Sequence, residues 1–191
     1  MARYNAVEKD LQRESNRLEK AEFNMASSEV IESIHIVMKE LKKELKRLKD
    51  MIDQHIDQSP SLKKDRKFLE SIPGVGPVVS QYMIAMIRSR DFKAATQCSA
   101  YVGLNPVHYE SGSSVRGRPH LSKRGSSLIR SKLYMAAVVA TQHNPDIRAQ
   151  YTRLLKQGKT KMSALCAAMR KLVQICFGVL KHQANYQPQT L

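Results

Sequence analysis

The stretch Phe68-Leu69-Glu70-Ser71-Ile72-Pro73-Gly74-Val75-Gly76-Pro77-Val78-Val79 joins two apolar segments through a turn rich in proline and glycine. Pro73 cannot continue a helix, and the glycines on either side of Val75 permit backbone angles that other residues rarely adopt. The pattern predicts a short helix, a tight turn and a second apolar helix over residues 80–87. No internal repeat and no convincing strand pattern occurs elsewhere, so the predicted fold class is all-α.

The segment 68–87 is similar to a helix-hairpin-helix motif. In that motif, glycines let the backbone N–H groups at the start of the second helix approach a DNA phosphate without an intervening side chain. Gly74 and Gly76 are therefore candidate nucleic-acid-binding residues. The alternative is a tight helix–helix corner that binds nothing, and the pattern fits both.

Residues 1–60 are predicted to form a coiled-coil region. Apolar side chains recur there at alternating steps of four and three, which is the seam of a coiled coil. This seam is Ile34, Met38, Leu41, Leu45, Leu48 and Ile52. Three heptads are short for an independent dimer, so we expect the seam to pack on the preceding helix, residues 3–26, as an antiparallel hairpin. Pro60 ends this region, because proline cannot continue a helix.

Positive charge is concentrated after this region. The 191-residue chain has a net charge of +15, yet residues 1–60 carry 11 basic and 12 acidic side chains. The remaining residues hold 21 basic and 5 acidic side chains. Such a surface indicates a polyanion partner, because displacing counterions from phosphates supplies affinity whatever the base sequence. We expect DNA as the partner rather than an acidic membrane, since no basic amphipathic helix with exposed large apolar side chains stands out.

Cysteine usage and the N-terminus predict an intracellular protein. Cys98, Cys166 and Cys176 have no metal-ligand spacing and are interpreted as reduced core residues. The first residues lack the apolar region of a signal peptide, and no apolar run appears long enough to span a membrane.

The segment Tyr109-Glu110-Ser111-Gly112-Ser113-Ser114-Val115-Arg116-Gly117-Arg118 carries three hydroxyls and two arginines between Pro106 and Pro119. It has neither a helical nor a strand period, so we expect it to lie outside regular structure. A serine oxygen held beside cations suits attack on a phosphate, because the cations offset charge on the phosphoryl oxygens in the transition state. The simpler alternative is a solvated basic loop that only contacts phosphates.

Spacing alone does not choose among Ser111, Ser113 and Ser114 as the nucleophile. His108 or His120 could accept the proton, since histidine titrates near neutrality. Four cations are candidates for binding phosphate and stabilising its charge: Arg116, Arg118, Lys123 and Arg124. Their simpler interpretation, and that of the histidines, is as solvated side chains that contact phosphate.

Residues 61–184 are predicted to form one compact basic helical domain. Helices are expected over residues 93–102, from Ser126 or Ser127 to about Gln142, from Asn144-Pro145 to Gly158, and from Thr160 onwards. The last helix has a wide apolar face. We expect Arg130 and Lys132 to face nucleic acid, and the polar tail 185–191 to be frayed.

Four motifs, in order and spacing, resemble one family. They are Ile72-Pro73-Gly74-Val75-Gly76-Pro77, Ala100-Tyr101-Val102-Gly103-Leu104-Asn105-Pro106, the segment from Tyr109 to Gly117, and Ser122-Lys123-Arg124-Gly125. The family is the IS-one-ten insertion-sequence transposases, relatives of the Piv invertase. The resemblance runs from about residue 63 to residue 181.

This resemblance implies a specific chemistry. Family members carry a RuvC-like domain whose four carboxylates hold Mg²⁺, then a coiled coil, then a helical domain with a nucleophilic serine. Matching the motif places that serine at Ser111, with Ser113 and Ser114 as nucleic-acid contacts. The serine would attack a DNA phosphodiester and form a phosphoserine linkage. The implied partners are a structured guide RNA, and homo-oligomers or full-length transposase subunits joined through the coiled coil. The implied location is the cytoplasm of a bacterium, in association with the nucleoid.

The acidic domain of the family has no counterpart in the predicted organisation. The basic part offers only the widely spaced carboxylates Asp65, Glu70, Asp91, Glu110 and Asp146, which do not form a metal-ligand pattern. We therefore expect no metal site in this chain, with Mg²⁺ supplied through an acidic domain on another segment. The sequence predicts a truncated transposase that binds nucleic acid. The alternative is a non-catalytic regulator that binds nucleic acid and full-length subunits.

Overall fold

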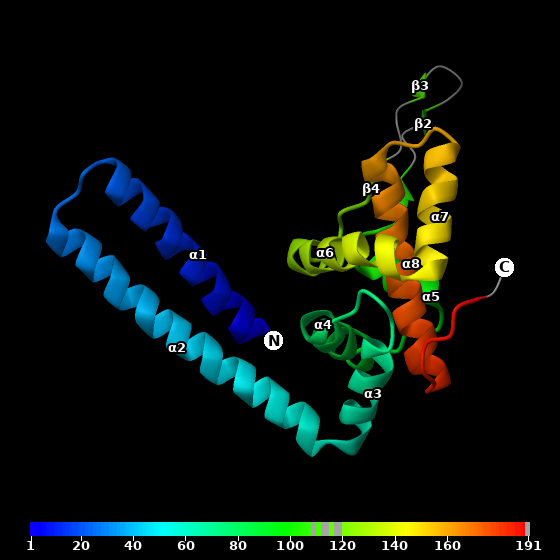
Figure 1. Ribbon diagram of the computed structural model, residues 1–191, viewed down its shortest axis with the longest axis horizontal. Helices are drawn as coiled ribbons and strands as arrows, with labels where there is room; N and C mark the ends of the chain where they lie inside the picture. The colour runs from blue at the N-terminus through cyan, green and yellow to red at the C-terminus, as the bar shows by residue number, and fades with distance from the viewer. Residues whose placement is uncertain (108–109, 112–114, 117–119, 190–191) are drawn as a thin grey trace. The chain divides into compact units, whose positions relative to one another are not determined.

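The computed structural model describes residues 1–107, 110–111, 115–116 and 120–189. The chain divides into two units, Met1–Pro60 and Ser61–Leu191. Helices dominate the described residues of both units, where the strands are four segments of two residues each (Figure 1). The prediction of an all-α fold is confirmed.

Unit 1 is a pair of helices, α1 (Ala2–Phe23) and α2 (Ser28–Gln58), which lie side by side and antiparallel (Figure 1). Along α2, the residues of the predicted seam are half-buried, whereas most of the residues between them are exposed. Burial of one stripe on each helix is what amphipathic helices need in order to pair. The prediction that the seam packs on the preceding helix is therefore confirmed, and coiled-coil geometry itself stays a prediction.

Unit 2 is built around α8 (Lys161–His182), against which α5 (Ala95–Tyr101), α6 (Ser127–His143) and α7 (Pro145–Lys156) pack. Ten residues of α8 are buried, including Leu172, Val173 and Cys176. An 18-residue window of α8 has a mean hydropathy of 1.5, long and apolar enough by composition to span a membrane, and half of that window is buried in the protein. Arg170 and Lys171 interrupt this window, so it is not an uninterrupted apolar run, and α8 is the core helix of unit 2.

Side chains cap the helices of unit 2 as their sequence predicts. Ser126 accepts a hydrogen bond from the Ile129 backbone N–H (3.4 Å), and Asn144 accepts one from that of Ile147 (3.2 Å). Thr160 caps α8 by accepting from the N–H of Ser163 (3.2 Å). Each bond satisfies a donor that the first turn of a helix leaves without a partner.

The two helices and the tight turn predicted from residues 68–87 correspond to α3 (Pro60–Glu70), the turn after it, and α4 (Pro77–Arg88). Gly74, in the turn, has φ +98, and a Cβ there would lie 2.7 Å from the Cβ of Ala140 on α6. Gly76 precedes α4 with open space around it. Packing against α6 therefore explains the glycine at position 74, and only Gly76 leaves the start of α4 open to a ligand.

The C-terminal tail is tied to unit 2. The Tyr186 N–H donates to the hydroxyl of Ser71 (2.8 Å), and the Tyr186 hydroxyl donates to the carboxylate of Asp146 (2.7 Å). Burial and the adjacent Asp146 carboxylate raise the pKa of Tyr186, so the phenol stays protonated at neutral pH. The expectation of a frayed tail is wrong for residues 185–189, because these hydrogen bonds hold the backbone in place.

A short β-hairpin interrupts the helices. Strands β1 (Pro106–Val107) and β4 (His120–Leu121) pair antiparallel, and β2 (Glu110–Ser111) pairs with β3 (Val115–Arg116). Figure 1 shows β2 and β3 beyond the ends of α7 and α8. The expectation that this segment lacks regular structure is wrong for these residues, because strands of two residues are too short to show a period of two in the sequence.

A buried ion pair joins the two helices of the turn. Asp65 on α3 is fully buried and accepts two hydrogen bonds from Arg88 on α4, at 2.6 and 2.7 Å, while Gln183 donates to it at 3.0 Å. The hydrogen bonds from Arg88 to the Asp65 carboxylate raise the pKa of that guanidinium. A bidentate pair of this kind fixes both distance and orientation.

Removing Arg88 should therefore destabilise unit 2. Arg88→Ala leaves the buried Asp65 carboxylate with Gln183 alone, and the free energy of unfolding should fall by about 3 kcal/mol. The control is Lys93→Ala, which removes an exposed ion pair with Asp91 and should leave stability nearly unchanged. Denaturant unfolding followed by circular dichroism measures both, and equal losses would contradict the structural role of the Arg88–Asp65 pair.

Candidate nucleic-acid interface

The C-terminal arm of the hairpin is hydrogen-bonded to the segment that follows α5. The N–H of Ser122 donates to the carbonyl of Asn105 (3.0 Å), and the N–H of Lys123 donates to that of Gly103 (3.2 Å). These bonds continue the pairing of β1 with β4 towards the helices. The hairpin that carries Ser111 therefore begins from a backbone already fixed to unit 2.

Two glycines permit this contact between backbones. Gly103 has φ +79, and a Cβ there would lie 2.9 Å from the backbone nitrogens of Arg124 and Gly125. A Cβ on Gly125 would lie 2.2 Å from the carbonyl oxygen of Tyr101, a distance that no side chain tolerates. Close packing of two backbone segments thus explains the glycine in each of the two motifs that contain these residues.

Arg130 holds the same two segments from the side. Its Nη1 donates to the carbonyls of Gly125 (2.6 Å), Val102 (3.2 Å) and Lys123 (3.4 Å). A guanidinium is well suited to bridging several carbonyls, because it carries five N–H donors in one plane. The expectation that Arg130 faces nucleic acid is not supported, since its Nη1 is committed to the backbone.

The predicted nucleophile, Ser111, lies on β2 opposite Val115 on β3. Arg116 lies on β3 opposite Glu110, and the exposed His120 lies on β4 opposite Val107. Four other predicted residues lie outside the described ones: His108, Ser113, Ser114 and Arg118. The roles of all these residues stay predictions.

The remaining predicted residues fall at opposite ends of α6. Lys123 and Arg124 are exposed in the turn beside Arg130, and Lys123 has φ +53. Gly74 meets α6 at Ala140, ten residues further along that helix and hence about 15 Å away. The structure therefore groups Lys123 and Arg124 with the hairpin, and separates Gly74 from it.

A groove of about 760 Å³ lies at the base of the hairpin, between α6 and the first turns of α8. It has an apolar part, hydroxyls, and four side chains that carry or can carry positive charge. Its lining residues are Leu104, Pro106, His120, Leu121, Lys123, Arg130, Ser131, Tyr134, Thr160, Met162, Ser163, Cys166, Ala167, Met169 and Arg170. We call this the hairpin groove.

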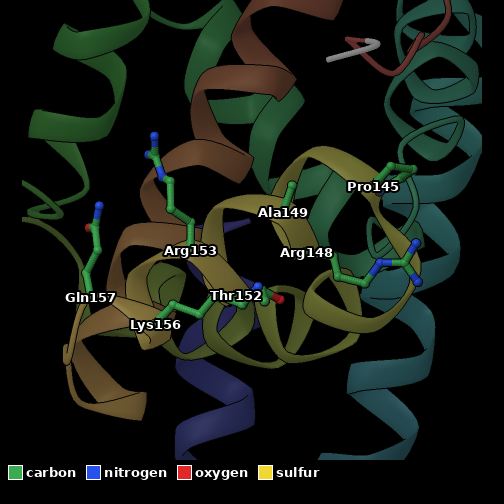
Figure 2. Close-up of a pocket in the computed structure, with 7 residues that line it drawn as sticks. All are labelled: Pro145, Arg148, Ala149, Thr152, Arg153, Lys156 and Gln157. Atoms are coloured by element: carbon green, nitrogen blue, oxygen red, sulfur yellow. The ribbon is translucent and has the colours of Figure 1, made fainter.

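A second basic surface runs along α7. Figure 2 shows Arg148, Arg153 and Lys156 projecting from this helix, beside a shallow hollow of about 600 Å³. Only α7 and the adjoining Gln157 line this hollow, so it is an open face rather than a cleft. We call it the α7 basic face, and it offers spaced cations to a polyanion.

The cysteines and carboxylates of the described residues do not form a metal centre. No group of three or more His, Cys, Asp or Glu side chains is placed there to hold an ion. Burial raises the pKa of Cys98 to about 12 and raises that of Cys176 further. Burial also raises the pKa of Cys166, against the opposing charge of Lys123. No chemical step is therefore assigned to a metal held by these residues.

The part of unit 2 that carries the hairpin matches a known protein family. Residues 66–152 match the model described as the Transposase IS116/IS110/IS902 family. The matched segment runs from α3 to α7 and contains the whole hairpin. This part of the chain belongs to that family, and the resemblance stated from the four motifs is confirmed.

Individual relatives include invertases and insertion-element proteins. The chain is 30% identical over 142 residues to the pilin gene-inverting proteins of Moraxella lacunata and Moraxella bovis, which is 73% of this chain and 44% of theirs. It is 27% identical over 120 residues to the uncharacterized 43.6 kDa protein of insertion element IS110 from Streptomyces coelicolor, or 62% of this chain and 29% of that protein. The chain thus spans less than half the length of the relatives it matches.

Two candidate binding surfaces were not predicted from the sequence. The sequence contains a signal for the α7 basic face. Arg148, Thr152 and Lys156 recur at steps of four, so they lie on one side of a helix, and the neighbouring Tyr151 is half-buried. The hairpin groove had no such signal. Its lining comes from separate segments between Leu104 and Arg170, and the packing of α6 on α8 brings them together.

The contact at Gly125 gives a direct test of this geometry. Gly125→Ala places a Cβ against the carbonyl of Tyr101, so stability should fall by about 3 kcal/mol and the base of the hairpin should open. The matched control is Gly178→Ala on α8, where no atom lies within 4 Å and alanine should instead stabilise the helix by about 1 kcal/mol. Thermal unfolding of both variants measures the difference, and a neutral Gly125→Ala would contradict the close contact.

Proposed function

We propose that this chain supplies the serine-bearing, nucleic-acid-binding part of a DNA transposase or recombinase. The family match supports a transposase or recombinase, and the excess of 21 basic over 5 acidic side chains after residue 60 supports a nucleic-acid partner. Ser111 is the proposed nucleophile. Lys123 and Arg124, with Arg116 and Arg118, are proposed to contact phosphates around it.

One observation carries the assignment of Ser111. This serine lies on a strand of the hairpin. The base of the hairpin is fixed by hydrogen bonds to the segment that follows α5 and by the guanidinium of Arg130. A nucleophile on an anchored element can be held at a phosphate, whereas one on a freely moving loop loses the advantage of orientation. The exposed cations of the neighbouring turn lie beside this base.

The proposed step is a transesterification. The Ser111 Oγ forms a bond to phosphorus as the bond from phosphorus to one deoxyribose oxygen breaks. The serine proton passes to a base, for which His120 or His108 is a candidate, and the departing oxygen takes up a proton to become a hydroxyl. The product is a phosphodiester that links the serine to DNA, so the energy of the ester bond is conserved. A hydroxyl of a second DNA strand can then attack this phosphorus and release the serine.

The resemblance also suggests partners for this chemistry. We include in the proposal a structured guide RNA, and assembly of subunits through the helical pair of unit 1. Mg²⁺ is proposed to act through carboxylates outside the residues described in this structure, and the same phosphate would then be activated from two sides.

The nucleophile is tested by trapping. An affinity-tagged chain is mixed with a nicked suicide DNA substrate, alone and with a full-length relative such as the pilin gene-inverting protein, and adducts on the tagged chain are identified by mass spectrometry. We expect a phosphoserine adduct that Ser111→Ala abolishes and that Ser113→Ala retains, because only one hydroxyl attacks.

Two outcomes would contradict this function. An adduct kept by Ser111→Ala and lost by Ser113→Ala would move the nucleophile to the neighbouring serine. Absence of an adduct in both mixtures, with DNA binding intact, would favour the alternative of a non-catalytic regulator that binds nucleic acid and full-length subunits.

A further inference from the structure

The hairpin groove combines surfaces that suit two parts of one ligand. Leu104, Leu121 and Met169 give it an apolar floor, while Lys123 and Arg170 bring positive charge. Among the described residues that line it, none is an Asp or a Glu. An apolar floor beside unopposed cations favours a ligand with a flat hydrophobic part and an anionic part.

The two arginines of the groove differ in their free donors. The Nη1 of Arg130 donates to three backbone carbonyls. The Nε of Arg170, in contrast, is buried and makes no hydrogen bond to any residue in the described part of the chain. The Nε itself is enclosed by the protein, but the Arg170 side chain lines the groove and its guanidinium adds positive charge there.

The start of α8 adds a second attraction for an anion. Thr160 and Ser163 line the groove, and the N-terminal end of this 22-residue helix carries partial positive charge. Backbone N–H groups at such a position commonly bind phosphate. This helix end and Arg170, which is also on α8, act on the same groove.

Tyr134 and Met162 provide the surface for a base. Tyr134 is 37% exposed on α6 and Met162 is 57% exposed on α8, and both line the groove. Aromatic rings stack on bases irrespective of sequence, and methionine packs well on flat rings. A base and its phosphate would therefore both find partners here.

We infer that the hairpin groove binds one unpaired nucleotide of the DNA strand, with its base against Tyr134 and Met162 and its phosphate at Lys123, Arg170 and the start of α8. The inference rests on the proposed function and adds a substrate feature to it. About 760 Å³ accommodates a nucleotide but not a duplex, whose bases stay stacked and paired. The groove thus selects DNA that is locally unpaired beside the hairpin.

Cys166 reports directly on this site. It lines the groove and is half-buried, whereas Cys98 and Cys176 are fully buried and serve as unreactive internal controls. The rate of Cys166 alkylation by N-ethylmaleimide is measured by peptide mass spectrometry with and without a short oligothymidine. With free oligonucleotide at about ten times its Kd, about one groove in eleven stays open, so alkylation should slow about tenfold.

Three additional arms make the result specific. A fully paired duplex at equal phosphate concentration should slow alkylation less than about twofold, because it cannot enter the groove. Tyr134→Ala and Arg170→Gln should each weaken oligothymidine binding about tenfold, as loss of one stacking or charged contact does. Lys181→Gln, an exposed cation near the far end of α8, is the matched control and should leave affinity unchanged.

The outcomes separate this inference from the proposed function. Oligothymidine that binds by fluorescence anisotropy without protecting Cys166 would overturn the groove while leaving the proposed function intact. Equal protection by duplex would overturn the requirement for an unpaired nucleotide, and protection by oligouridine alone would overturn DNA as its source. Absence of binding to both single-stranded and duplex DNA would contradict the proposed function itself.

Discussion

The organisation of unit 2 depends on one close contact between two backbone segments. Gly125 lies against the end of α5 so closely that its Cβ would overlap the Tyr101 carbonyl, and Arg130 bridges the carbonyls of both segments. Because these contacts are made by backbone atoms and one planar guanidinium, they fix orientation as well as distance. This contact lies next to three features: the hairpin, the exposed Lys123–Arg124 turn and the hairpin groove.

The contact also relates the charge of the chain to its architecture. Positive charge is concentrated after residue 60, and several cations gather near the hairpin and along α7. Arg130 and Arg88 are exceptions, since Arg130 bridges carbonyls and Arg88 holds the buried Asp65. A basic domain of this kind therefore uses some of its cations for structure, while exposed ones such as Lys123 and Arg124 can contact phosphates.

Local signals in the sequence were enough for the helices. Caps at Ser126, Asn144 and Thr160, and the apolar period of α8, predicted elements that the structure contains, because capping and amphipathicity depend on residues a few positions apart. The hairpin was missed because two-residue strands leave no period. The anchored tail was missed because the partners of Tyr186 lie at least forty residues away in the sequence.

The same limit applied to the site. Motifs pointed to the segment around Ser111 and to the glycines, but they did not separate glycines that pack from glycines that bind. Gly74 is required for packing on Ala140 of α6, whereas Gly76 is open, and only the three-dimensional contact distinguishes them. The hairpin groove depended on α6, α8 and the strands together, so no single stretch of sequence could indicate it.

Amide hydrogen exchange at the base of the hairpin tests the central claim most directly. The N–H groups of Ser122 and Lys123 donate to the carbonyls of Asn105 and Gly103. If the hairpin is anchored to the helical domain, these two amides should exchange at least about a hundredfold more slowly than in an unfolded chain. Exchange at the rate of an unfolded chain, with the amides of α8 still protected, would show that the hairpin is not held and would contradict the account.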